Sequence, residues 1–440
     1  MRRKRRFGIA TTLTGALAIS AAVASSASAH KATAASSSLK GTTINVAIAY
    51  PAPKADLAQF TKQTGIKVNW NYVQWDSLQT KIAAAAQAHS YFADVTDVDW
   101  SKVGEYYATK WFQPLNKYFP LASVRAQYPQ APAFIRKGQL LGMPMDGSLL
   151  VTTMNEKYLH AAGVKRNPTT LTQYEADLKA IAAKTSAKNP LDIPFAAAEG
   201  LSTYWYEMTA AFGGNVLSAN YKPLFTSPSS PGYKAMAWMI NAYKTGLVPK
   251  ANLNMQDYQA LETDQAHGVT ASVFSDYSGD VGTIYNVPSQ SKVVGQVSYI
   301  PTPGAKGVGA NLGNPDGIGI PTTAKHVAAA LVFMKWMEQP ANQAAFAGAK
   351  GSKYVIPTFP LPSNRGGLAD LVKSHKVPGA ATLQALLEHH AKPIFPAGAP
   401  PWYAQFSNAV YTNIHQAASG SESVGAAISA IAQQVKSLGG

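Results

Sequence analysis

The sequence contains no cysteine, and this absence removes several kinds of chemistry at once. Disulfide bridges, thiolate nucleophiles and cysteine-bound metals are excluded, so the fold must be held together by its core. The lipid-modified cysteine that tethers many exported proteins to a membrane is excluded as well. Beyond the N-terminal region, no stretch approaches the roughly 18 consecutive apolar residues of a membrane-spanning helix.

Acidic residues are also scarce. The 440 residues include 23 Asp and Glu against 38 Lys and Arg, which gives a formal charge of +15. No dense cluster of Lys and Arg follows the first few residues. The net positive charge therefore reflects the small number of acidic residues and does not indicate a nucleic-acid-binding surface. We expect a mildly basic, solvated surface and no nucleic-acid partner. The 46% hydrophobic content indicates a globular chain, and its length favours two domains.

The N-terminal region has the pattern of a secretory signal peptide. Five basic residues precede an apolar stretch from Phe7 to Val23, and Ala27-Ser28-Ala29 forms a small-residue cleavage site. We expect residues 1–29 to be removed and the mature protein to begin near His30, outside the cytoplasmic membrane. The pattern leaves open whether export follows the Sec or the twin-arginine route. Residues 30–41 are rich in Ala, Ser and Thr and are predicted to form a flexible leader.

Strand and helix patterns alternate along the rest of the chain. The β-branched run from Thr42 to Tyr50 predicts a buried strand, and Lys54 to Thr64 has helical spacing that ends at Gly65. The alternation continues with strands at 66–72, 95–98, 138–144, 149–154, 269–274 and 295–300, and with helices at 76–88, 100–110, 172–185, 204–212, 232–244, 324–337 and 403–438, the last broken at Gly420. This order predicts an α/β fold.

Several stretches resemble one known family in sequence and in order. They are FTKQTGIKVNW (60–70), ADVTDVDW (93–100), GQLLGMPMDGSLLVTTMNEKYLHAAGV (138–164), AAALVFMKWM (328–337) and PPWYAQFSNAVYTNIHQAASG (400–420). This order resembles the extracellular solute-binding proteins of ABC importers, in particular the carbohydrate-binding family that includes maltose-binding proteins. The identity, length and linkage of the ligand are not implied, because Ser275-Asp276-Tyr277-Ser278 replaces the family's usual Gly-Pro-Trp segment.

The resemblance implies a type II periplasmic-binding-protein-like fold, in which two lobes are joined by three hinge crossings. Carried onto this sequence, the first lobe comprises 42–149 and 317–360, the second comprises 150–316 and 361–440, and the crossings fall near 146–151, 311–319 and 355–361. It also implies a protein that is not an enzyme. We expect a monomer that captures a sugar or oligosaccharide by hinge closure and presents it to importer membrane subunits, without a cofactor or a metal.

A carbohydrate site needs hydrogen-bonding groups for the hydroxyls and flat aromatic walls for the C–H faces. Each stacked aromatic contributes about 1–2 kcal/mol. The candidate ligand-binding residues are Trp402, Tyr403, Trp205, Tyr204, Tyr277, Asp276, Asp99, Trp100, Asp146 and Tyr50. Neighbouring helical residues point about 100° apart, so at least one aromatic of the run from Tyr204 to Tyr206 is expected to face the cleft. Two alternatives stay open: Asp99 is only a helix cap, and Tyr277 lies in a surface turn.

A secreted carbohydrate-active hydrolase is the alternative function. The sequence has no Gly-x-Ser-x-Gly elbow and no His-Glu-x-x-His helix. Paired carboxylates for glycoside hydrolysis remain open. Asp94, Asp97 and Asp99 lack the spacing and the glycine of a calcium loop, so no calcium site is expected. Four tryptophans at amphipathic positions are assigned to the core: Trp75, Trp111, Trp238 and Trp336.

Overall fold

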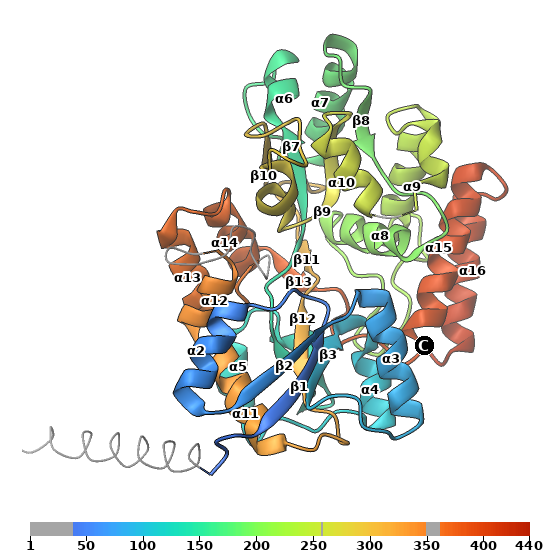
Figure 1. Cartoon of the computed structure of the whole chain (residues 1–440). Coiled ribbons are helices and arrows are strands. Elements are labelled where there is room, and N and C mark those ends of the chain that lie inside the picture. The colour runs from blue at the N-terminus through green and yellow to red at the C-terminus, as the bar shows by residue number, and fades with distance from the viewer. Residues whose placement is uncertain (1–37, 257, 349–360) are drawn as a thin grey trace, which may run out of the picture.

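The computed structural model describes residues 38–256, 258–348 and 361–440. The predicted signal peptide, most of the leader and nearly all of the third predicted crossing lie outside the described residues. Two β-sheets, each covered by helices, form a lower and an upper lobe in Figure 1. The predicted two-lobed α/β fold is therefore confirmed. Within the described residues, no helix has both the length and the apolar character needed to cross a membrane.

The lower lobe is built on a five-stranded sheet. Its strand order is β2 (Lys67–Tyr72), β1 (Thr43–Ile48), β3 (Val95–Asp99), β12 (Asp316–Gly319) and β6 (Met143–Pro144). The first three strands are parallel because α2 (Lys54–Thr64) and α3 (Trp75–Gln87) carry the chain back between them, whereas β12 is antiparallel to β3 and β6. Phe60 of α2 packs edge-on against Phe333 of α11 (Val327–Met337), with ring centres 5.4 Å apart.

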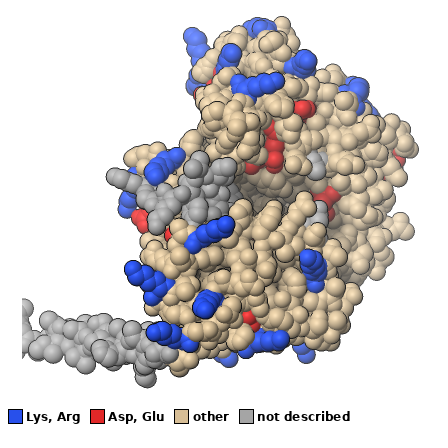
Figure 2. Space-filling view, viewed as in Figure 1, with Lys and Arg blue, Asp and Glu red and all other residues tan. Residues whose placement is uncertain are grey.

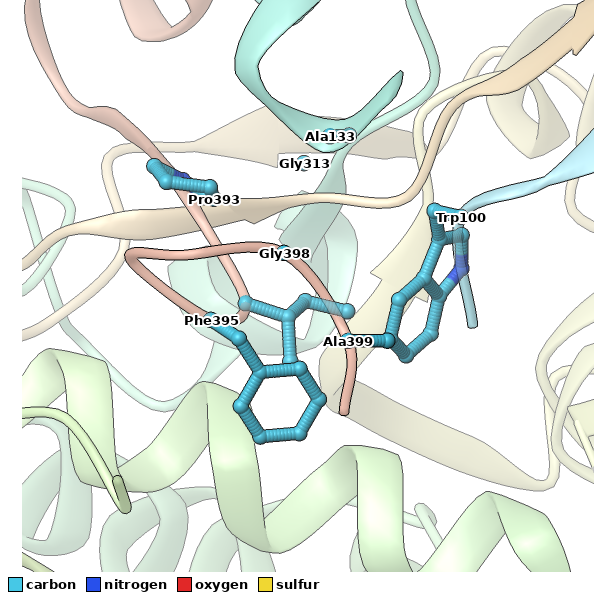
Figure 3. A pocket seen from close by; sticks show the side chains of 8 residues that line it. Trp100, Ala133, Gly313, Pro393, Phe395, Gly398 and Ala399 are labelled. Carbon is cyan, nitrogen blue, oxygen red and sulfur yellow. The ribbon is translucent and has the colours of Figure 1, made fainter. Parts of the chain in front are cut away.

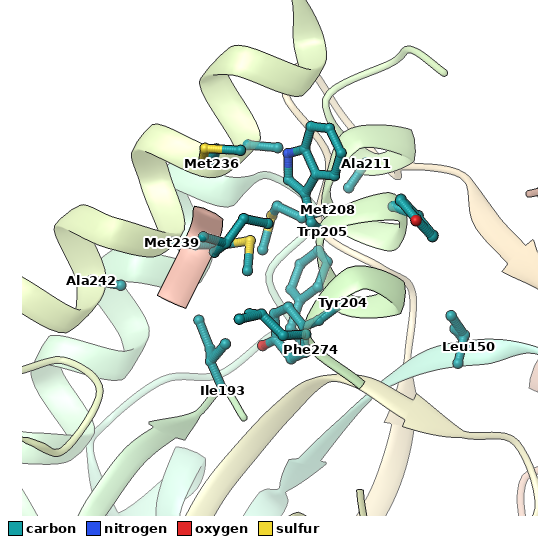
Figure 4. Packing of buried hydrophobic residues seen from close by; sticks show 14 of the residues in the cluster. Leu150, Ile193, Tyr204, Trp205, Met208, Ala211, Met236, Met239, Ala242 and Phe274 are labelled. Atoms are coloured by element: carbon teal, nitrogen blue, oxygen red, sulfur yellow. The ribbon is translucent and has the colours of Figure 1, made fainter. Parts of the chain in front are cut away.

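The upper lobe is built on a four-stranded sheet and a thick layer of helices. The strand order is β10 (Val297–Ile300), β7 (Leu150–Asn155), β9 (Thr270–Tyr277) and β8 (Asn189–Asp192). The helices are α7 (Leu171–Lys184), α8 (Glu199–Ala211), α9 (Pro231–Lys244), α10 (Tyr258–Ala266), α15 (Tyr403–Ser419) and α16 (Val424–Ser437). Figure 4 shows α8 and α9 packed through methionines and Trp205 above β9. One large apolar cluster joins these elements.

Three segments run beside one another where the sheets meet. The chain leaves β6 and enters β7 through residues 145–149, and it returns through β11 (Asn311–Gly313) to β12. Met145 donates its N–H to the carbonyl of Asp316 at 2.8 Å, and Gly147 donates to the carbonyl of Leu361 at 2.8 Å. These segments therefore brace one another, while their action as hinges stays a prediction.

The remaining elements are short or lie at the side of the junction. They are α4 (Val103–Thr109), α5 (Leu121–Gln127), β4 (Ile135–Arg136), β5 (Gln139–Leu140), α6 (Glu156–Ala161), α12 (Pro340–Phe346), α13 (Arg365–Ser374), α14 (Ala380–His389) and β13 (Ala391–Pro393). Helices α12 to α14 contribute to a third apolar cluster together with Leu149 and Val151.

Two predicted boundaries were wrong in ways that affect the site. Helix α8 begins at Glu199 rather than Tyr204, and β9 continues through Asp276 and Tyr277.

Candidate functional site

The carboxyl ends of the parallel strands bring polar and aromatic side chains to one edge of the lower sheet. Tyr50 follows β1 and Trp75 follows β2. Asp99 ends β3, and Trp100 begins the short helix after it. Parallel strands end at the same edge of a sheet, which is where open α/β sheets place ligands. Trp75 is 38% exposed and Tyr72 is 60% exposed. The expectation that Trp75 belongs to the core was therefore wrong, and this ring extends the edge.

Asp99 acts as a helix cap at this edge. It accepts a hydrogen bond from the backbone N–H of Ser101 at 2.7 Å, and the Trp75 side chain donates a second bond to it. Burial raises the pKa of Asp99, and these hydrogen bonds partly oppose that rise. Asp99 therefore caps the short helix that follows β3, and the same carboxyl also holds the exposed indole beside it.

Tyr50 and Asp146 form a carboxyl cluster with Asp316 at the junction of the lobes. The Tyr50 hydroxyl lies 2.5 Å from Asp146 Oδ2 and 3.0 Å from Asp316 Oδ2. A hydroxyl has one hydrogen to donate, so the second contact requires a proton on a carboxyl. Burial, followed by the charges of Asp97 and Asp146, raises the pKa of Asp316 well above its usual range. The cluster ties two interlobe segments together.

The upper lobe presents Glu199 at the start of α8. The Ser407 hydroxyl donates to Glu199 Oε2 at 2.6 Å, and the Tyr403 hydroxyl donates to Oε1. Glu199 is exposed, yet desolvation by its surroundings raises the pKa of its carboxyl, as expected at the wall of a crevice. The charge of Asp99 raises this pKa further, while Lys102 lowers it. Glu199 therefore lies within electrostatic range of these two charges of the lower lobe.

The Trp100 side chain extends from the lower lobe and contacts aromatic residues of the upper lobe. Its indole N–H donates to Asn314 Oδ1 at 2.8 Å, and its ring centre lies 5.4 Å from that of Tyr403 and 6.2 Å from that of Phe395. Figure 3 shows Trp100 and Phe395 on the walls of a small pocket that also includes Gly398 and Ala399. This pocket holds little more than a water molecule, so it is an interlobe packing defect rather than a ligand site.

Trp402 and Tyr277 are the half-buried aromatics among the candidates from the upper lobe. Trp402 lies edge-on against Tyr221, with ring centres 5.7 Å apart. Tyr277 lies against Tyr258 with ring centres 4.6 Å apart. Burial, then neighbours that include Tyr258 and Asp316 of the lower sheet, raise the pKa of Tyr277 well above its usual range. Tyr277 therefore also lies near the junction.

Three other candidates lie inside the upper lobe. Tyr204 and Trp205 have no exposed surface, and Tyr206 is only 2% exposed, so the expectation that one of these rings faces the cleft was wrong. The Trp205 indole donates to the carbonyl of Gly232 at 2.9 Å, because α9 and α15 cover the helix. Asp276 is also fully buried and accepts from Thr153 at 2.6 Å and Tyr285 at 2.9 Å.

The space-filling view also shows a hollow at the junction of the lobes (Figure 2). Figure 2 shows the molecule hollowed between the lobes, with acidic side chains on the walls of the hollow and most lysines and arginines on the outer surface. Oxygen acceptors and flat rings from both lobes suit a ligand that has many hydroxyls and apolar C–H faces. Among the described residues, no group of three or more His, Asp or Glu is arranged to hold a metal ion.

Comparison with known families gives one clear match. The bacterial extracellular solute-binding protein family matches residues 42–344. A search among curated proteins gave no match.

Solved structures share the fold at low sequence identity. The maltose-bound MalE3 of T. maritima has a TM-score of 0.73 and 18% identity, covering 90% of this chain and all of that one. A solute-binding protein of Thermotoga lettingae bound to α-D-tagatose has a TM-score of 0.74 and 18% identity, covering 91% and 100%. A third, from Agrobacterium radiobacter K84 with ribitol, has a TM-score of 0.71 and 19% identity, covering 91% and 99%.

Proposed function

Because the chain belongs to the family of bacterial extracellular solute-binding proteins, we propose that it captures a sugar or oligosaccharide outside the membrane and delivers it to an ABC importer. The ligand binds between the lobes, and the chain is exported by its N-terminal signal peptide. The sugars, the polyol and the transporter context of the structural neighbours support this proposal.

The observation that carries the proposal is that side chains of the two lobes approach one another at the junction: the Trp100 ring lies 5.4 Å from that of Tyr403, and the charge of Asp99 acts on Glu199. In the proposed site, Trp75, Asp99 and Asp316 form the wall of the lower lobe, and Glu199 and Trp402 form that of the upper lobe. A ligand that touches only one lobe binds the open and closed forms equally, so it does not shift the equilibrium between them. A ligand that contacts both lobes favours the closed form. Closure takes place about the segments near 146–151, 311–319 and 355–361, and the closed form presents both lobes to the importer.

A thermal-shift screen tests the function. We expect a raised midpoint with at least one of maltose, tagatose, mannitol, ribitol and chitin oligosaccharides, because ligand at 100 times its Kd adds about 2.7 kcal/mol. Small-angle scattering should show compaction with the same ligand. If none of these compounds raises the midpoint or compacts the protein, the proposal fails. Release of reducing sugar from an oligosaccharide would instead support the hydrolase alternative.

Trp402→Ala tests the aromatic wall. We expect sugar affinity to fall at least tenfold, about 1.4 kcal/mol, because the stacked indole face is lost. Trp238→Ala is the matched control: Trp238 is also half-buried, but its indole donates to Glu175 on the outer helices at 3.2 Å. Equal affinities of wild type and Trp402→Ala, measured by titration calorimetry, would remove Trp402 from the site.

A further inference from the structure

Arg136 is a half-buried cation that reaches from one lobe to the other. It ends β4 in the lower lobe, and its Nη1 donates to the carbonyl of Ala397 at 2.7 Å and to the Tyr221 hydroxyl. Its guanidinium also lies 4.9 Å from the centre of the Tyr221 ring. Burial lowers the pKa of Arg136, and none of the ion pairs among the described residues includes it. Burying a cation without an acidic partner costs free energy, so the contacts that Arg136 does make should have another role.

Tyr221 receives this contact in an unusual backbone conformation. Its φ is +59°, a left-handed value that costs a bulky residue about 1–2 kcal/mol. The turn is closed by a hydrogen bond from the N–H of Tyr221 to the carbonyl of Ser218 at 2.9 Å. The Tyr221 hydroxyl lies 3.2 Å and 3.1 Å from the carbonyls of Ala397 and Gly398. The strained turn therefore brings this hydroxyl to the segment that leads into Trp402.

The same tyrosine supports the Trp402 ring directly. The planes of the two rings meet at 72°, while Phe406 contacts the indole edge-on at a centre distance of 6.1 Å. Edge-on pairs of this kind hold a ring in one orientation and contribute about 0.5–1.5 kcal/mol beyond the buried area. Arg136 and Tyr221 thus fix both the backbone before Trp402 and the side chain itself.

We infer that Arg136 is a positioning residue, which orients the Trp402 indole through Tyr221 and the Ala397 carbonyl without touching the ligand. The inference rests on the proposed function, in which Trp402 stacks on the sugar. Because Arg136 belongs to the lower lobe and Trp402 to the upper lobe, the contact makes the orientation of the stacking ring depend on the relative position of the lobes. The ring is set for its ligand when the lobes meet.

A double-mutant cycle tests whether Arg136 acts through Trp402. Affinity for maltose, or for the compound with the largest shift in the five-ligand screen, is measured for wild type, Arg136→Ala, Trp402→Ala and the double variant. We expect Arg136→Ala to weaken binding about tenfold alone and less than twofold when Trp402 is already Ala. An equal loss in both backgrounds would overturn the inference. Arg125→Ala, on the exposed face of α5, controls for loss of charge.

A second measurement needs no ligand. Acrylamide quenching of the Trp402 emission is obtained as the difference between proteins with and without Trp402→Phe. We expect Arg136→Ala and Tyr221→Phe to make this emission easier to quench, and Arg136→Lys to restore part of the protection, with the thermal midpoint within a few degrees of wild type. Unchanged quenching overturns the inference. Raised quenching in a protein that binds no sugar keeps the positioning role and rejects the proposed function.

Discussion

Glu338 is a buried acid whose proton should control the stability of the lower lobe. It is 8% exposed, it follows the end of α11, and its Oε2 accepts from Gln343 at 3.3 Å. Its Oε1 has no hydrogen-bond partner among the described residues. Burial raises the pKa of Glu338 from 4.5 to about 8, although a hydrogen bond with Tyr128 opposes the rise. The folded protein therefore holds this proton at a pH where the unfolded chain has lost it.

The sign of the effect follows from that difference. Between pH 4.5 and about 8 the folded state binds more protons than the unfolded state, so the stability contributed by this group is lost as the pH rises. At about 1.4 kcal/mol per pKa unit, the loss reaches about 5 kcal/mol. Glu338→Gln keeps the shape and mimics the protonated acid. We expect it to match wild type near pH 4.5 and to exceed it increasingly toward pH 9.

Urea denaturation of both proteins between pH 4.5 and pH 9 measures this gap in the free energy of unfolding. The difference between the two proteins cancels the titration of other buried acids. Asp370→Asn, at an exposed carboxylate of α13, is the control. A gap that stays constant within about 0.5 kcal/mol over this range would refute the raised pKa, since the two states would then bind the same number of protons at this site.

Two further substitutions test the packing between the lobes. In Gly104→Ala, the new Cβ would lie 2.3 Å from the Ala399 carbonyl oxygen, so we expect a cost of about 1–3 kcal/mol and a lower thermal midpoint. Gly282→Ala, where nothing lies within 4 Å, should leave the midpoint nearly unchanged, and equal effects of both would contradict this reading. Tyr50→Phe removes the hydroxyl that bridges the carboxyl cluster, which leaves the buried Asp146 with one hydrogen-bond donor fewer. We expect the free energy of unfolding, measured by denaturation, to fall by about 1–3 kcal/mol. No change would show that the bridge contributes nothing.

Local patterns predicted much of the fold because the relevant signals lie within a few residues. Helix α2 occupies the predicted residues 54–64, and the two C-terminal helices are separated at Gly420, whose φ of +86° favours glycine. The short strand β8, which contains Pro190, carries no alternating pattern, and its place is decided by pairing with β9. Helices α12 to α14 were missed because they pack on one another and on residues distant in the sequence, such as Val281, Val297 and Tyr299.

The site was harder to predict because burial depends on which elements cover one another. Trp205 lies in a helix that is buried all round from Gly200 to Ala211, although this stretch includes Ser202, Thr203, Glu207 and Thr209. No uniformly apolar pattern therefore announced the burial of Trp205 in the sequence. Trp75 and Glu199 begin helices after a strand and a loop, respectively. Their exposure depends on the gap between two lobes, which no local pattern encodes.

The position of Trp100 makes its fluorescence a reporter of the motion of the two lobes. The indole is attached to the lower lobe, but it is 9% exposed among the rings of the upper lobe. Rotation of the lobes away from each other would bring it into water and shift its emission to longer wavelength. Since the chain has no native cysteine, an introduced pair would also be the sole sites for thiol-reactive dyes. Lobe motion can thus be followed by two independent spectroscopic signals in one molecule.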